Sequence, residues 1–154
     1  MAVEEPLVEN VMEKAVMAVD LNVNAAECAG GMAKRGVSSA VVTQGGTAVG
    51  IVTERDLVSK VLADALDPKK VLVRDIMSTP LITVPANAKI TTAASVMAEY
   101  RIRRLVVVDD AGTLLGIITA GDLARNLAEK HDYKEATLNA VARYRGGFEG
   151  GPYQ

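Results

Sequence analysis

The sequence GIVTERDL at residues 50–57 recurs as GIITAGDL at residues 116–123, and this recurrence is the strongest indication of the fold. The duplication extends upstream, where Val11-Met12 corresponds to Ile76-Met77. The second copy has an additional residue in the turn that precedes the recurring stretch. Repeat solenoids need at least three units, so two copies predict a pair packed on each other with pseudo-two-fold symmetry.

Each copy predicts the same order of elements, which is strand, helix, strand, strand, helix. In the first helix of each copy, apolar or small residues recur at i, i+3, i+4 and i+7, as on the buried face of a helix. The two hairpin strands are β-branched and nearly continuously apolar, which indicates burial on both faces. Asn24 and Glu27 form a capping pair at the start of the first helix. The fold class is therefore α/β (α+β), with two βαββα repeats. The expected strands cover 16–19, 40–43, 48–52, 81–84, 105–108 and 114–118, and the second helices cover 54–66 and 120–130.

These elements define the expected domain organisation. One domain covers residues 1–131, with repeat one at about 7–66 and repeat two at about 72–130. Pro68 disfavours helix at the residue before it and so marks the linker. Residues 132–154 are expected to hold a further helix, at about 134–144, and a flexible glycine-rich tail.

Composition narrows the class of protein. A chain of 154 residues with 49% hydrophobic residues suits one compact domain. Lys and Arg number 17 against 19 Asp and Glu, which argues against a nucleic-acid partner. The single cysteine, Cys28, allows no intramolecular disulfide and favours a reducing, cytoplasmic location. No apolar run approaches the roughly 20 residues that span a bilayer, so we expect no membrane association.

Catalytic chemistry finds little support in the sequence. His131 and Cys28 are the only histidine and cysteine, so one chain cannot assemble a zinc site of the usual spacing. A histidine-dependent nucleophile would have to use His131, whose position among charged residues at a helix end is typical of a surface residue. Glycine-rich phosphate loops of the usual patterns are also absent from the sequence. We therefore expect no enzyme, no metal and no required cofactor.

The recurring Thr-x-x-Asp, at Thr53/Asp56 and at Thr119/Asp122, is the best candidate for binding. It lies where a strand passes into a helix, and free backbone N–H groups at a helix start receive anions. The aspartate can accept two hydrogen bonds from a vicinal diol such as a ribose. The same pattern also fits a helix capping box, and the residues alone leave both interpretations open.

A second candidate is the basic run Arg101-Ile102-Arg103-Arg104, directly before a buried strand. These arginines need either solvent or an anionic partner. A nucleic-acid binder that uses Arg101–Arg104 is an alternative interpretation, although the acidic balance of the chain opposes it.

In order, spacing and duplication, these residues resemble a tandem cystathionine-β-synthase (CBS) domain pair over about residues 7–130. Each copy has a short helix ending in Met, a strand, a helix, and a hairpin that ends in Gly-φ-φ-Thr-x-x-Asp, where φ is apolar. The stretch from Arg103 to Asp122 is similar to the nucleotide-binding repeats of the γ subunit of AMP-activated kinase.

The resemblance implies two clefts between the paired sheets, each taking an adenosine-containing molecule. It implies that Asp56 and Asp122 hold the ribose hydroxyls, with Thr53 and Thr119 beside them. It places phosphates against Arg103 and Arg104, whereas the first copy departs from that pattern with Ser38 and Ser39. Adenine is implied to lie against Met17, Val37 and Ser38 in copy one and against Ile82 and Ile102 in copy two.

The resemblance also implies a disc-shaped homodimer. The first helix carries a run of small residues that includes Gly30-Gly31, and glycine within a helix costs about 1 kcal/mol relative to alanine. Close packing against another helix would offset that cost, and so would a contact within the same chain. We expect a regulatory module that binds AMP, ADP, ATP or an S-adenosyl compound and reports to an unknown regulated protein. The alternative of the same fold is a protein-interaction scaffold without a ligand.

Overall fold

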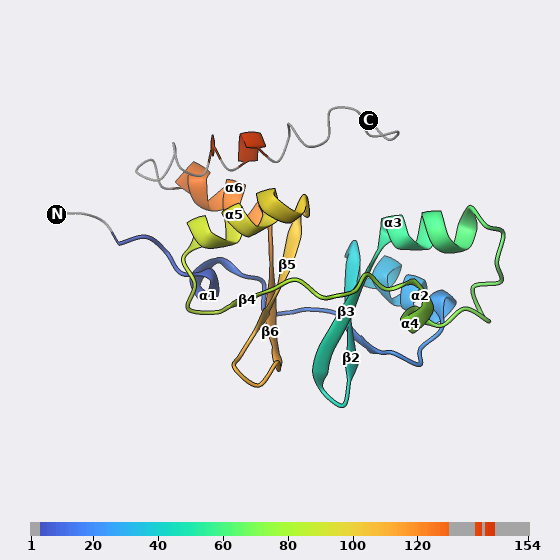
Figure 1. Cartoon of the computed structure of the whole chain (residues 1–154). Coiled ribbons are helices and arrows are strands. Elements are labelled where there is room, and N and C mark those ends of the chain that lie inside the picture. The colour runs from blue at the N-terminus through green and yellow to red at the C-terminus, as the bar shows by residue number, and fades with distance from the viewer. Residues whose placement is uncertain (1–3, 130–137, 140, 144–154) are drawn as a thin grey trace. The chain divides into compact units, whose positions relative to one another are not determined.

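The computed structural model describes residues 4–129, 138–139 and 141–143, and the chain divides into two compact units (Figure 1). The repeat-1 unit comprises residues 15–82 and 111–114, and the repeat-2 unit comprises the described residues among 1–14, 83–110 and 115–154. Residues 138–139 and 141–143 are helical, whereas the rest of the helix predicted at 134–144, His131 and the glycine-rich tail lie outside the described residues.

The repeat-1 unit is a three-stranded sheet with helices packed on it. The strand order is β1-β2-β3, with β1 parallel to β2 and β2 antiparallel to β3. Residues Ala40, Val41 and Val42 of β2 are fully buried, which confirms the prediction of a strand covered on both faces. The elements of this unit are β1 (Ala18–Asp20), α2 (Ala25–Arg35), β2 (Ser39–Gln44), β3 (Thr47–Thr53), α3 (Glu54–Leu57), the π-helix η1 (Val58–Leu62) and α4 (Val73–Ile76).

The repeat-2 unit repeats this plan with the order β4-β5-β6 and with β4 parallel to β5. Four residues of its first long helix, Ile90, Ala93, Ala94 and Met97, are buried at the predicted spacing. Its elements are α1 (Val8–Val11), β4 (Thr83–Pro85), α5 (Ile90–Tyr100), β5 (Arg104–Val108), β6 (Leu114–Thr119) and α6 (Ala120–Glu129). The two βαββα repeats are thus observed, with a short helix added to each.

The short helices α1 and α4 are exchanged between the repeats. Helix α1 precedes the first repeat in the chain but belongs to the repeat-2 unit, where Val8 N donates to Ala88 O at 2.8 Å. Helix α4 precedes the second repeat but belongs to the repeat-1 unit, where Val73 N donates to Val23 O at 2.9 Å. Each compact unit is therefore completed by the helix that leads into the other repeat.

The glycine of each Gly-φ-φ-Thr-x-x-Asp motif makes room for a methionine of the exchanged helix. A Cβ at Gly116 would lie 2.8 Å from Met12 Sδ and 2.7 Å from the carbonyl oxygen of Glu13. A Cβ at Gly50 would lie 2.5 Å from Met77 Sδ. The recurring Gly and the recurring Met thus belong to one packing arrangement in each unit.

Two details of the sequence-based prediction are wrong. The first strand of each copy begins two residues later than predicted, at Ala18 rather than at residue 16 and at Thr83 rather than at residue 81. Pairing with the next strand starts at Ala18 with Val41 and at Thr83 with Val106. The helix predicted at 54–66 is regular only to Leu57, after which the chain forms a π-turn. There Ala63 N donates to Val58 O at 2.8 Å, five residues back, which adds one residue to the turn.

Candidate functional site

The junction between β6 and α6 is a complete capping box. The backbone N–H of Thr119 donates to Asp122 Oδ2 at 2.8 Å, and the N–H of Asp122 donates to Thr119 Oγ1 at 3.1 Å. Asp122 is 8% exposed, and its other oxygen, Oδ1, forms an ion pair with Arg125 one turn along α6.

The junction between β3 and α3 has the same arrangement. Thr53 N donates to Asp56 Oδ2 at 2.9 Å, and Asp56 N donates to Thr53 Oγ1 at 3.3 Å. Oδ1 of Asp56 pairs with Lys60 Nζ at 3.0 Å and also accepts from Ser78 Oγ at 3.5 Å. The capping interpretation of Thr-x-x-Asp therefore describes both copies. The capping box is compatible with a role in binding, because it uses Oδ2 of each aspartate, whereas Oδ1 interacts with other side chains.

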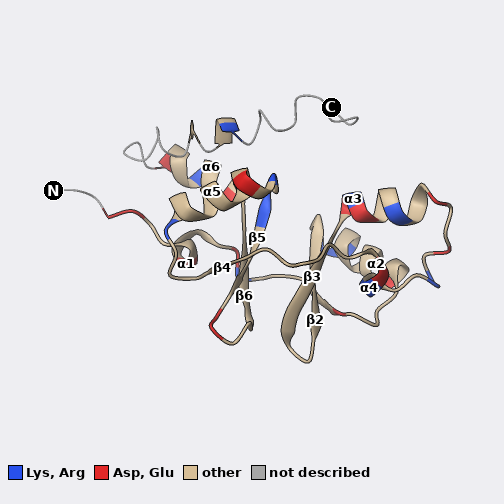
Figure 2. Cartoon of the chain, in the orientation of Figure 1, with Lys and Arg blue, Asp and Glu red and all other residues tan. Residues whose placement is uncertain are grey.

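The residue that opens each hairpin lies beside the capping box. The carbonyl oxygen of Arg103 accepts from Ala120 N at 2.8 Å, and the carbonyl oxygen of Ser38 accepts from Glu54 N at 3.0 Å. The structure thus brings Arg103 to the start of α6 and Ser38 to the start of α3. Arg103 is exposed and Arg104 half-buried, and Figure 2 shows basic residues at the start of β5 and acidic residues at the start of α3.

The residues expected to contact adenine divide between the two units. Met17, Val37 and Ser38 belong to the repeat-1 unit together with Thr53 and Asp56, and Ile102 belongs to the repeat-2 unit together with Thr119 and Asp122. Ile82, which the resemblance places in copy two, is the last residue of the segment 15–82 and so belongs to the repeat-1 unit.

Met17 has an additional structural role. It is buried, and its Cε would lie 2.5 Å from a Cβ at Gly31. The lack of a Cβ at Gly31 is therefore explained by its contact with Met17 of the same chain. No such contact explains Gly30, because nothing within the described structure lies within 4 Å of a Cβ placed there.

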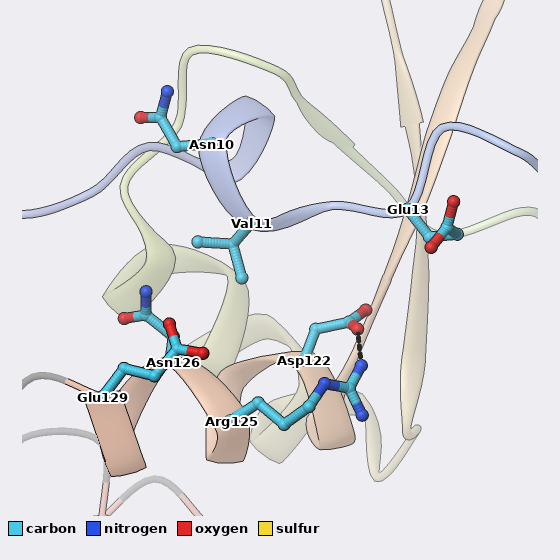
Figure 3. Close-up of a pocket in the computed structure, with 7 residues that line it drawn as sticks. All are labelled: Asn10, Val11, Glu13, Asp122, Arg125, Asn126 and Glu129. Atoms are coloured by element: carbon cyan, nitrogen blue, oxygen red, sulfur yellow. Dashed lines mark hydrogen bonds and ion pairs between the residues drawn. The ribbon is translucent and has the colours of Figure 1, made fainter.

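A polar pocket of about 280 Å³ lies beside Asp122, between α1 and α6 (Figure 3). Asp122, Arg125, Asn126 and Glu129 line it from α6. Asn126 Oδ1 is buried and has no hydrogen-bond partner among the described residues. Buried acceptors without a partner are rare in native structures, so Asn126 stands out among the residues that line the pocket. The remaining lining residues are Asn10, Val11 and Glu13.

The cations that pair with the two aspartates were not expected from the sequence. Lys60 and Arg125 follow their aspartates at the i+4 and i+3 spacings that place side chains together on a helix, and this spacing is visible in the sequence. The contact of Glu5 was not expected either; its Oε1 accepts from Thr91 N at 2.8 Å and caps the first turn of α5. No local pattern could have indicated that contact, because the two residues are far apart in the sequence.

Two further observations concern metals and membranes. Across residues 4–129, 138–139 and 141–143, no group of three or more His, Cys, Asp or Glu side chains is placed to hold a metal ion. Over the same residues, no helix has both the length and the apolar character needed to cross a bilayer.

Comparison with known proteins identifies the family. The CBS domain model matches residues 8–63 and 73–129, which are most of the chain. The CBS domain-containing protein YhcV of Bacillus subtilis is 32% identical over 132 residues, which are 86% of this chain and 93% of that protein. The chain therefore belongs to the CBS domain family and carries a tandem CBS pair.

Other relatives are longer than this chain. The uncharacterized protein MK0525 of Methanopyrus kandleri is 44% identical over 100 residues, which are 64% of this chain and 51% of that protein. The chain thus spans about half the length of that relative.

Solved structures with the same fold contain adenosyl ligands. The CBS domain pair of protein MJ0100, in complex with 5′-methylthioadenosine and S-adenosyl-L-methionine, has a TM-score of 0.74 and 27% identity, covering 82% of this chain and 98% of that one. The CBS domain protein PAE2072 from Pyrobaculum aerophilum, complexed with AMP, has a TM-score of 0.73 and 26% identity, covering 89% of this chain and 98% of that one.

Proposed function

We propose that this chain is a regulatory module that binds an adenosine-containing compound through Asp56 and Asp122 and catalyses no reaction. The observation that carries the proposal is the duplicated capping box, in which a nearly buried carboxylate uses one oxygen for the helix cap and keeps Oδ1 for side-chain partners. The adenosyl ligands of MJ0100 and PAE2072 support the same ligand class.

The chemistry of the proposed contact is simple. Oδ1 of each aspartate would accept a hydrogen bond from a ribose hydroxyl, and a charged acceptor makes such a bond about twice as strong as a neutral one. Thr53 and Thr119 hold the carboxylates in place through the cap. The adenine would lie against residues directly before β1 and β4 and before the hairpins, which are the apolar Met17, Val37, Ile82 and Ile102 and the polar Ser38.

Calorimetric titration with AMP, ADP, ATP, S-adenosylmethionine and 5′-methylthioadenosine tests the proposal. Asp56→Asn and Asp122→Asn are the sharpest variants, because asparagine keeps an acceptor for the cap and removes only the charge. Each variant should remain folded, which its unliganded melting curve checks, and should lose most of the binding in its own unit. A ligand at 100 times its Kd should stabilise the wild type by about 2.7 kcal/mol. If none of these compounds binds, the scaffold alternative is the better description.

Phosphate selectivity should differ between the two copies. Arg103 and Arg104 offer guanidinium groups that hold phosphate oxygens in pairs of charge-assisted hydrogen bonds, whereas Ser38 and Ser39 offer only neutral hydroxyls. The preference for AMP over adenosine should therefore be strong where Asp122 binds the ribose, and it should weaken with added salt. The Arg103→Ala, Arg104→Ala double variant should lose this preference, and an unchanged preference would show that these arginines do not bind phosphate.

We also propose that the chain forms a homodimer through the helices of its repeat-1 unit. Val58 and Leu62 of η1 and Leu66 just beyond it are 54%, 73% and 47% exposed, and nothing described lies within 4 Å of a Cβ placed at Gly30. Light scattering should give twice the chain mass of 16.2 kDa for the wild type. Leu62→Asp should give the monomer mass, and Leu115→Asp, in the exposed part of β6, should not. A monomeric wild type at micromolar concentration would contradict this assignment.

A further inference from the structure

The repeat-1 unit contains a bound ammonium group supplied by its own chain. Lys60 Nζ lies 3.0 Å from Asp56 Oδ1 and donates a hydrogen bond to the carbonyl oxygen of Ile76 at 2.8 Å. Asp56 is the motif aspartate, and Ile76 is the last residue of the exchanged helix α4. Between them they form an acceptor pair that holds a primary ammonium.

The repeat-2 unit has the counterparts of both acceptors but not the lysine. Asp122 corresponds to Asp56, and Val11, the last residue of α1, corresponds to Ile76. The counterpart of Lys60 is Asn126, whose side chain is shorter and uncharged. The polar pocket opens at this position, where it is lined by Asp122, Val11 and Asn126 (Figure 3).

The groups around the pocket suit a cation that donates hydrogen bonds. Asn126 Oδ1 is a buried acceptor without a partner in the described part of the chain. The lining includes the carboxylates of Glu13, Asp122 and Glu129 and a single guanidinium, that of Arg125. Arg125, with a side chain 72% exposed, meets Asp122 from the surface.

We propose that the pocket between α1 and α6 binds a primary alkylammonium group, which takes the position that Lys60 Nζ has in the other repeat. The ammonium pairs with Asp122 Oδ1 and donates to the carbonyl oxygen of Val11, as Lys60 Nζ does with Asp56 Oδ1 and the carbonyl oxygen of Ile76. The shared chemistry fits a free amine or the ammonium of an adenosyl compound. The free-amine form does not depend on the adenosyl proposal.

The test uses n-butylammonium, which reproduces the lysine side chain, in an NMR titration of the full chain. Amide shifts should move at Val11, Asp122 and Asn126, with a Kd on the order of 1 mM. Asn126→Lys supplies the ammonium from within, so it should abolish these shifts. Arg125→Ala should strengthen binding several-fold. Tetramethylammonium at the same ionic strength, which donates no hydrogen bond, should not reproduce the shifts, and equal shifts with it or with Asn126→Lys would overturn the proposal.

A reciprocal variant covers the case in which Asn126→Lys does not fold. Lys60→Ala empties the ammonium position of the repeat-1 unit and should lower the melting temperature, and millimolar n-butylammonium should restore part of the loss. A lack of rescue together with a lack of wild-type shifts would overturn the proposal.

A comparison of two adenosyl compounds identifies the source of the ammonium. S-adenosylmethionine carries an ammonium group and 5′-methylthioadenosine does not. If Asn126→Lys weakens only the former, the ammonium belongs to the adenosyl ligand; if it weakens neither but abolishes n-butylammonium binding, the pocket takes a free amine. Failure of every adenosyl compound to bind would leave the n-butylammonium result unaffected.

Discussion

At the scale of single residues, Asp122 has two separable roles. Its Oδ2 caps α6 and its Oδ1 lies in an ion pair. Asp122→Ala removes the cap and should cost about 1 kcal/mol of unfolding free energy, as other cap deletions do. Asp122→Asn keeps an acceptor for the cap and removes only the ion pair with the exposed Arg125, which is worth about 0–1 kcal/mol, so it should cost less than Asp122→Ala. Urea denaturation measures both, and equal losses would mean that the charge, rather than the cap, stabilises α6.

Cys28 should be chemically inert in the folded protein. It is fully buried, and burial raises the pKa of its thiol, so less of the reactive thiolate is present. A thiol reagent that turns yellow when it reacts should modify Cys28 slowly in the native protein and rapidly in denaturant, both measured at pH 8. Because the folded state binds this proton more tightly than the unfolded state, the unfolding free energy should fall as pH rises above the ordinary thiol pKa. Rapid native-state reaction would show that α2 opens readily.

At the scale of elements, the two motif glycines should respond differently to substitution. Gly116→Ala places a Cβ against the backbone carbonyl of Glu13, which is held to β6 by Glu13 N to Ile117 O at 2.9 Å. For Gly50→Ala, the three atoms nearest the added Cβ all belong to the side chain of Met77. Overpacking costs about 1–3 kcal/mol, and Gly116→Ala should fall at the upper end of this range.

The paired methionine variants provide the control. Adding Met77→Ala to Gly50→Ala removes the atoms that clash and should restore part of the stability. Adding Met12→Ala to Gly116→Ala should restore little, because the Glu13 carbonyl remains. Thermal unfolding of the four variants measures the difference, and equal rescue in both units would contradict the backbone contact at Gly116.

At the scale of the whole molecule, the compact units do not follow the linear repeats. We expect residues 15–82 to fold better as a fragment than residues 7–66, the range expected for repeat one from the sequence. The longer fragment includes α4 and Val71, whose carbonyl accepts from Ala25 N at 2.8 Å. Circular dichroism and NMR dispersion measure the folded fraction, and a well-folded 7–66 fragment would show that α4 is dispensable.

Much of this architecture could be predicted because it is encoded locally. Alternation of turns and β-branched runs indicated the strands, and Asn24 indicated the start of α2, where its Oδ1 accepts from Glu27 N at 2.8 Å. The exchange of α1 and α4 could not be predicted, since four-residue helices carry no signal of which unit they join. The cap of α5 by Glu5 also depends on a contact between distant segments.

The candidate site was predictable only in part. Its motif aspartates stand out by duplication, and the structure confirms their capping geometry. The pocket beside Asp122 depends on α1, which joins α6 only in three dimensions. The difference between Lys60 and Asn126 is visible in the sequence, but its meaning requires the contacts of Lys60.

The exchange of short helices has a consequence for biosynthesis. Helix α1 leaves the ribosome before either repeat, yet its partners α5 and α6 are among the last described elements to be translated. The repeat-1 unit likewise needs α4 and residues 111–114. Domains usually fold in order from the N-terminus during synthesis. Val8 and Met12 of the nascent chain therefore lack their native neighbours until α6 emerges, so the repeat-2 unit cannot be completed until the second repeat is almost fully translated.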